Sequence, residues 1–100
     1  MQVRVASATE LQAGECKVVE AGGKQLALYN VGGTFYATDN ECRHRGGPLG
    51  DGILQGHMII CPLHYWKYDV RTGEQEMSHA IRLSCYAVTV VDGEVFVEVG

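Results

Sequence analysis

The sequence contains no long hydrophobic run and no strongly basic stretch. No segment approaches the roughly 18 apolar residues that a membrane span needs, so we expect no membrane association. The formal net charge is −4, and no basic stripe is present to neutralise phosphates, so we expect no nucleic-acid partner. This acidic balance instead suits docking to a basic patch on another protein.

Helical periodicity is also nearly absent. Hydrophobic segments are short or alternate with polar residues, and glycine-containing turns separate them, which is typical of an all-β protein. The segments expected to form strands are 3–6, 16–20, 25–31, 34–38, 53–54, 58–60, 66–70, 86–91 and 94–99. Gly22-Gly23, Gly32-Gly33 and Asp92-Gly93 mark hairpin turns. Because there is no linker or repeat, we expect a single domain over residues 1–100, built as a small antiparallel sandwich or barrel.

Two short loops combine cysteine with histidine. The first contains Cys42-x-His44 and the second, sixteen residues later, contains Cys61-x-x-His64. Two thiolates and two imidazoles form a ligand set that is typical of a metal site. The hairpin expected between the loops returns the chain beside its start, so it would place the two loops next to each other.

The residues around these loops carry a more specific pattern. They include Gly47-Pro48-Leu49, Gly52, Pro62, Trp66, Tyr68-Asp69 and Thr72-Gly73. Together with the four Cys and His residues, this pattern resembles the Rieske-type iron–sulfur proteins. It is most similar to the small Rieske ferredoxins that serve bacterial ring-hydroxylating oxygenases.

The resemblance implies a fold and a cofactor. The fold is a Rieske-like antiparallel β-sandwich or barrel with a small cluster-binding subdomain at about residues 40–68. The cofactor is a [2Fe–2S] cluster, with Cys42 and Cys61 on one iron and His44 and His64 on the other. Zinc stays an alternative, because two Cys and two His suit tetrahedral coordination. Zinc fingers usually pair like ligands, however, and the mixed pair in each loop favours iron.

The resemblance also implies a function. The chain would be an electron carrier and not itself an enzyme, taking one electron from a flavin-dependent NAD(P)H reductase and passing it to a terminal oxygenase. The same motifs also resemble the Rieske-type small subunit of NAD(P)H nitrite reductases, whose partner is the large subunit. A structural zinc-binding module is the alternative from another class.

Several positions depart from other members of the family. High-potential Rieske proteins have a disulfide-linked cysteine in each loop, at the positions of Gly47 and Leu63. They also place a serine hydroxyl near the cluster where this chain has Trp66, whereas their tyrosine is retained as Tyr68. With fewer donors to the cluster, we predict a potential near the low end of the Rieske range, roughly −150 mV. Tyr65 stands where many relatives have glycine, which affects the expected loop shape and docking surface.

The remaining cysteines and histidines are not assigned to the site. Cys16 and Cys85 could pair in principle, but residues 1–7 hold no apolar signal-peptide core. We therefore expect reduced thiols in a cytoplasmic protein, buried as small hydrophobic side chains. His57 at a hairpin tip and His79 in a loop are expected at the surface.

Three residues beside the ligand loops keep two interpretations each. Arg43 and Arg45 are either solvated charges or part of a docking rim. Trp66 is either a core residue or a shield over the cluster.

Overall fold

The computed structural model describes residues 1–99, and nearly all of its regular structure is antiparallel β-sheet, which confirms the all-β prediction. The strands are β1 (Gln2–Ser7), β2 (Cys16–Ala21), β3 (Lys24–Val31), β4 (Thr34–Asp39), β5 (Ile53–Gln55), β6 (Met58–Ile60), β7 (Lys67–Asp69), β8 (Cys85–Tyr86), β9 (Val88–Val91) and β10 (Glu94–Glu98). Two short 3-10 turns, η1 (Ala8–Glu10) and η2 (Leu49–Asp51), interrupt them.

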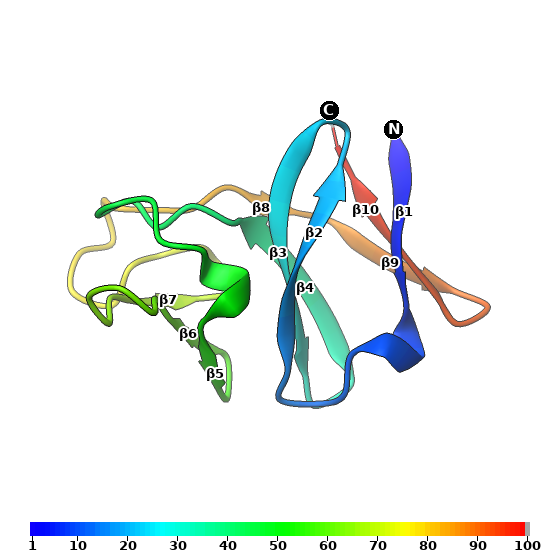
Figure 1. Cartoon of the computed structure of the whole chain (residues 1–100), viewed down its shortest axis with the longest axis horizontal. Coiled ribbons are helices and arrows are strands. Elements are labelled where there is room, and N and C mark those ends of the chain that lie inside the picture. The colour runs from blue at the N-terminus through cyan, green and yellow to red at the C-terminus, as the bar shows by residue number, and fades with distance from the viewer. Residues whose placement is uncertain (100) are drawn as a thin grey trace.

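The strands form three small sheets, with strand orders β1-β10-β9, β2-β3-β4-β8 and β5-β6-β7. The β5-β6-β7 sheet lies at one end of the molecule and the β9–β10 hairpin at the other, with β2, β3 and β4 between them (Figure 1). The hairpin predicted at Gly22-Gly23 is confirmed. Both residues have positive φ, +59° and +81°, which glycine adopts without steric cost.

Strand β3 joins the two halves of the molecule because it is buried on both faces. Side chains alternate across a strand. Leu26 and Leu28 therefore pack in one core with Val95 and Val97 of β10, whereas Tyr29 points into a second core. Full burial of each such aliphatic side chain stabilises the fold by about 1.5–3 kcal/mol.

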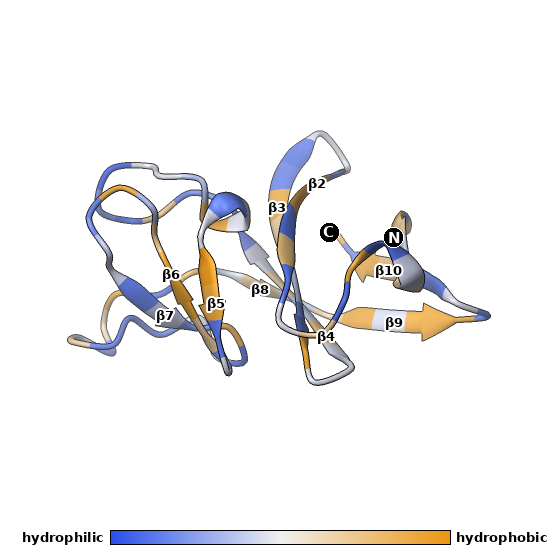
Figure 2. Cartoon of the chain, turned by 60° about the horizontal axis from the view of Figure 1, so that its bottom comes forward, coloured by the Kyte–Doolittle hydropathy of each residue, from blue (hydrophilic) through white to orange (hydrophobic). Residues whose placement is uncertain are grey.

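The second core supports the half of the molecule that carries the Cys and His loops. Its large buried side chains are Tyr29, Leu49, Ile59, Tyr68 and Val70. In Figure 2, β5 and β6 are largely hydrophobic. Ile59 of β6 is part of this core and Leu54 of β5 packs against it, whereas Ile53 is 56% exposed. The ligand loops are therefore attached to a packed base and are not free connections.

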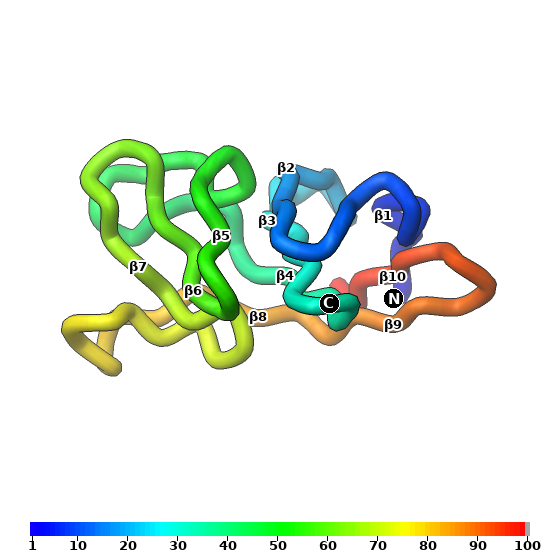
Figure 3. The backbone as a smooth tube through the Cα atoms, turned by 90° about the horizontal axis from the view of Figure 1, so that it is seen from below, coloured from blue at the N-terminus to red at the C-terminus, as the bar shows by residue number. Residues whose placement is uncertain are grey.

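The hairpin predicted between the two loops is also confirmed. Ile53 pairs with Ile60 and Gln55 pairs with Met58, so residues 56 and 57 form a two-residue turn. Figures 1 and 3 both place the loop after β4 and the loop between β6 and β7 at the same end of the molecule.

The single strand predicted over residues 86–91 is wrong. The segment changes sheets: Tyr86 pairs with Ala37 of β4, whereas Val88 pairs with Val97 of β10. Ala87, at the change, accepts a hydrogen bond from the Glu98 N–H (2.9 Å). Because local alternation is the same on either side of such a corner, the sequence pattern does not reveal it.

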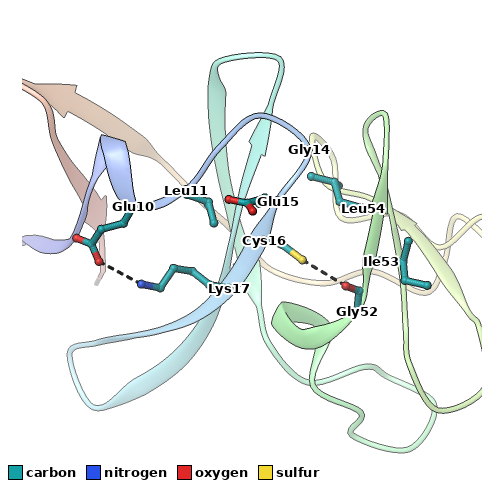
Figure 4. A pocket seen from close by; sticks show the side chains of 9 residues that line it. All are labelled: Glu10, Leu11, Gly14, Glu15, Cys16, Lys17, Gly52, Ile53 and Leu54. Atoms are coloured by element: carbon teal, nitrogen blue, oxygen red, sulfur yellow. Dashed lines mark hydrogen bonds and ion pairs between the residues drawn. The ribbon is translucent and has the colours of Figure 1, made fainter.

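Two further corrections concern the cysteines outside the loops. Cys85, expected to be buried, is exposed, because it lies on the edge strand β8. Cys16 is half-buried and lines a groove of about 480 Å³ beside η1, β2 and β5. Figure 4 shows its thiol directed at the Gly52 carbonyl, 3.6 Å away.

None of the helical turns within residues 1–99 is long and apolar enough to cross a membrane.

Candidate metal centre

The two predicted loops lie side by side. The ring centroids of His44 and His64 are 4.9 Å apart in an edge-to-face arrangement, and both side chains are exposed. The Cys42 and Cys61 side chains are 3% and 2% exposed and adjacent to each other. The structure therefore brings the four residues together as a buried thiol pair and an exposed imidazole pair.

The first loop is a tight turn that starts at Cys42. The Gly46 N–H donates to the Cys42 carbonyl (2.8 Å), and the Cys42 N–H donates to the Gly47 carbonyl (2.9 Å). Gly46 has a positive φ of +69°. The side-chain oxygen of Asn40 accepts a hydrogen bond from the Gly50 N–H (2.8 Å), which fixes the base of the loop to the end of β4.

The second loop repeats this turn with the same spacing. The Tyr65 N–H donates to the Cys61 carbonyl (3.0 Å), and the Cys61 N–H donates to the Trp66 carbonyl (2.8 Å). Tyr65 occupies the position of Gly46 and also has a positive φ, +62°. This left-handed conformation costs a residue with a Cβ about 1–2 kcal/mol. The loop thus keeps the glycine-type shape although its sequence has tyrosine there.

The start of β7 places two aromatic rings against the first loop. The Tyr68 hydroxyl lies 3.3 Å from the Cys42 sulfur and accepts a hydrogen bond from the Arg43 N–H (3.0 Å). Trp66 stacks on His44 with centroids 4.5 Å apart and an interplanar angle of 5°. Trp66, for which the sequence left core and shielding roles open, therefore covers one face of the His44 ring.

The space around the buried sulfurs requires glycine at position 47. A Cβ on Gly47 would lie 2.6 Å from the Cys61 sulfur and 3.0 Å from a Leu63 carbon. High-potential Rieske proteins have their loop disulfide at the positions of Gly47 and Leu63. In this chain the same two residues lie against each other without a covalent bond. Among the described residues all four cysteines are free.

The environment of the Cys61 thiol opposes ionisation in the absence of a cation. Burial raises the pKa of Cys61, and the neighbouring Cys42 thiol raises it further. The backbone N–H groups of Leu63 and His64 partly oppose this rise. A pair of buried thiols therefore becomes a pair of thiolates most readily when positive charge is bound beside it.

Arg43 braces the first loop and is not a free charge. Its guanidinium contacts the Asp39 carboxylate (2.8 Å) and donates to the Arg82 carbonyl (3.0 Å). Its side chain is still 43% exposed, so a solvated charge and part of a docking rim both stay predictions beside this structural role. Arg45 is exposed, as both interpretations required.

The Asp39 carboxylate is the centre of this brace, and sequence reasoning missed it. Burial alone would raise the pKa of Asp39. The carboxylate accepts hydrogen bonds from the Tyr86 hydroxyl (2.6 Å) and the Ser84 N–H (3.1 Å). Together with the charge of Arg43, these bonds hold the pKa below its ordinary value. Burial and the same hydrogen bond raise the pKa of Tyr86 to about 12. The available signal was only that Asp39 ends the strand leading to Cys42.

The two other histidines lie outside the pair, as expected. His57 is in the β5–β6 turn, 3.8 Å from the Asp69 carboxylate, and His79 is exposed. Across residues 1–99, no group of three or more His, Cys, Asp or Glu side chains is arranged to hold one metal ion. A two-iron cluster takes two protein ligands per iron, and the thiol pair and the imidazole pair match that donor set.

Comparison with known proteins identifies the family. The model of the Rieske [2Fe-2S] domain matches residues 1–87. The chain belongs to this family. Its cofactor is accordingly a Rieske-type [2Fe–2S] cluster, in place of the zinc that the four residues alone allowed.

The Rieske relatives include ferredoxin components of dioxygenase systems. The chain is 45% identical over 65 residues to the ferredoxin component of the naphthalene 1,2-dioxygenase/salicylate 5-hydroxylase systems of a Ralstonia species, a match covering 65% of this chain and 62% of the relative. The matched part thus spans less than two thirds of that relative.

Solved structures of the family extend the similarity along the whole chain. The ferredoxin of carbazole 1,9a-dioxygenase from Nocardioides aromaticivorans IC177 superposes with a TM-score of 0.93 at 29% identity, covering 100% of this chain and 99% of that one. A ferredoxin solved in complex with the oxygenase of carbazole 1,9a-dioxygenase is 36% identical, with a TM-score of 0.88 and coverage of 96% and 91%.

Proposed function

We propose that Cys42 and Cys61 hold one iron of the [2Fe–2S] cluster and that His44 and His64 hold the other. The support is the pairing itself: like donors lie together, with the thiols buried and the imidazoles exposed. The close approach of Gly47 to the Cys61 sulfur fits a cradle with no room for a side chain. On this proposal residues 1–100 are one domain, and its cluster-binding subdomain covers about residues 40–68.

The ligand set determines what the site can do. When bound, the cluster supplies one reversible one-electron couple. Two neutral imidazoles in place of two thiolates remove negative charge, so the reduced form is easier to reach than in an all-cysteine cluster. Burial keeps the thiols away from solvent, and the exposed histidines bring the redox centre to the surface, where a partner can approach.

The function that follows is electron transfer, with no catalytic step in the chain itself. We propose that it accepts an electron from a flavin-dependent NAD(P)H reductase and delivers it to a terminal oxygenase. The exposed histidine pair at one end of the molecule carries this proposal. Similarity to ferredoxin components of dioxygenase systems, one of them solved with its oxygenase, favours an oxygenase as acceptor over a nitrite reductase large subunit.

A cytoplasmic location is part of the same proposal. It is supported by Cys16 and Cys85, the two cysteines outside the ligand loops, which are unpaired, because reduced thiols are the usual state in that compartment.

The proposal is tested first on the purified protein. Iron and acid-labile sulfide are expected at about two each per chain, with visible absorption and a rhombic paramagnetic resonance signal after one-electron reduction. Replacing any one of the four ligands by alanine is expected to abolish the signal, whereas His57→Ala, the matched control, retains it. A colourless zinc protein, or a cluster that survives His64→Ala unchanged, contradicts the assignment.

A further inference from the structure

Tyr65 has a backbone conformation that its side chain does not favour. Its φ is +62°, and the equivalent position of the first loop is Gly46, with φ +69°. The shared hydrogen-bond pattern shows that the turn needs only a residue tolerant of this conformation. Glycine serves in one loop, so the fold does not require tyrosine in the other. Strained positions of this kind concentrate where function repays the cost.

The side chain of Tyr65 contributes little to the chain's own packing. It is 69% exposed, and within residues 1–99 its hydroxyl makes no hydrogen bond and its ring stacks on no other aromatic ring. Leu63, on the other side of His64, is 50% exposed. Two large apolar side chains therefore flank the exposed histidine in solvent. An apolar centre with polar surroundings is typical of protein interfaces, where tyrosine is enriched.

The two histidines differ in their surroundings. Trp66 lies flat on His44 and covers one face of that ring. Leu63 and Tyr65 are the residues directly before and after His64 in the chain, and the Leu63 side chain also lies against Gly47 of the first loop. A partner that contacts Leu63 and Tyr65 therefore also approaches His64.

The charge distribution favours an apolar contact at this end. Residues 40–84 contain five Lys or Arg and five Asp or Glu, so the rest of the chain carries the whole net charge of −4. At physiological salt, exposed charges act over about 8 Å. The acidic character expected to guide docking is thus concentrated away from the histidines.

We propose that Leu63 and Tyr65 form the contact surface for the protein acceptor, the terminal oxygenase, and that Tyr65 inserts into an apolar recess on it. This inference rests on the proposed function. In the contact, one electron passes from the reduced cluster to the acceptor, the cluster is oxidised by one electron, and no bond or proton is exchanged. The conformational cost of Tyr65 is repaid in the complex.

The test compares two acceptors. The dithionite-reduced holoprotein is mixed anaerobically with ferricyanide, which needs no docking, or with the terminal oxygenase proposed as its acceptor, and reoxidation is followed by visible absorption. Tyr65→Gly is expected to lower the second-order rate constant with the oxygenase about tenfold. Its rate with ferricyanide and its resonance signal stay as in the wild type, and its unfolding midpoint does not fall. Tyr65→Phe retains the rate with the oxygenase. Val91→Thr replaces a methyl group by a hydroxyl on an exposed residue at the end of β9. Strand β9 belongs to the hairpin at the opposite end of the molecule (Figure 1), so both rates stay unchanged.

Each other outcome overturns a defined part of the inference. Equal oxygenase rates for Tyr65→Gly and the wild type refute the contact. A parallel loss with ferricyanide means that Tyr65 acts on the cluster and not on docking. A loss in Tyr65→Phe as large as in Tyr65→Gly refutes the apolar recess. A wild-type protein that reduces ferricyanide but not the oxygenase refutes the proposed function, and this inference with it.

Discussion

Replacing Gly47 by alanine tests whether the space around the Cys61 sulfur is as tight as the structure indicates. The added Cβ would lie 2.6 Å from that sulfur and 3.0 and 3.2 Å from two carbons of Leu63. Non-bonded heavy atoms prefer separations of about 3.5–4.0 Å, so the sulfur has to move by about 1 Å. Leu63 is half-exposed and can rotate away, but Cys61 is buried and, on the proposed ligand assignment, would move away from the iron that it holds.

The expected cost follows from this overlap. Overpacking a filled interior costs about 1–3 kcal/mol. For a domain of this size, each kcal/mol lowers the unfolding midpoint by about 4–8 °C. We therefore expect Gly47→Ala to lower the midpoint by about 4–24 °C and to reduce the iron and sulfide bound per chain. Both are measured on the purified protein at one scan rate, because loss of the cluster makes unfolding irreversible.

Two further variants separate the causes. In Gly47→Ala/Leu63→Ala the contact with Leu63 is removed but the contact with the sulfur remains, so the defect should persist. Gly46→Ala adds a Cβ that meets nothing within 4 Å but has to adopt a φ of +69°. It should lose about 1–2 kcal/mol of stability and keep a normal cluster spectrum. A Gly47→Ala protein with wild-type iron content, potential and midpoint would refute the reasoning.

Three other predictions concern the potential and the pH dependence. Redox titration of the wild type should give a midpoint potential of roughly −150 mV. If the cluster still assembles in His64→Cys, the added negative charge should lower the midpoint potential below the wild-type value. An unchanged midpoint contradicts the ligand role of His64. Tyr68→Phe removes the hydroxyl 3.3 Å from the Cys42 sulfur and should lower the potential by about 40 mV, equivalent to about 1 kcal/mol per electron; no shift would mean that this contact does not favour the reduced form. The folded-state pKa of Asp39 is depressed, so its stabilising contribution is complete above its unfolded pKa of about 3.9 and is lost as pH falls through the folded value. Asp39→Asn should therefore be less stable than the wild type at pH 7, by an amount that shrinks toward pH 3 in thermal unfolding; a constant difference contradicts this sign.

Much of the fold could be read from local patterns. The turns at Gly22-Gly23 and Asp92-Gly93 and the alternation that buries Val95, Val97 and Val99 are properties of neighbouring residues, and they are present in the structure. The change of sheets at residue 87 could not be read in this way. Which strand lies beside Tyr86 and which beside Val88 depends on pairing with residues far away in the chain.

The surroundings of single side chains also could not be predicted from local sequence. Cysteine is usually a core residue, but Cys85 lies on the exposed edge strand β8. The sequence does not reveal this, because only the assembled sheet shows which strand is at the edge. Arg43 was expected to be either solvated or part of a docking rim. Its partner Asp39 lies four residues earlier, and its other contact, the Arg82 carbonyl, comes from a distant segment.

The sequence by itself determined the chemistry of the centre. Ligand type, ligand spacing and the presence of Gly47 and Leu63 at the positions of the loop disulfide are chemical properties of the chain. They favoured a Rieske-type donor set over zinc before any folding was considered. Only the tertiary structure decided how that set is presented: thiols inside, imidazoles outside, Trp66 against one histidine, and Tyr65 strained and exposed beside the other. These relations join residues through space across two loops, and local sequence constrains each loop but not their contact.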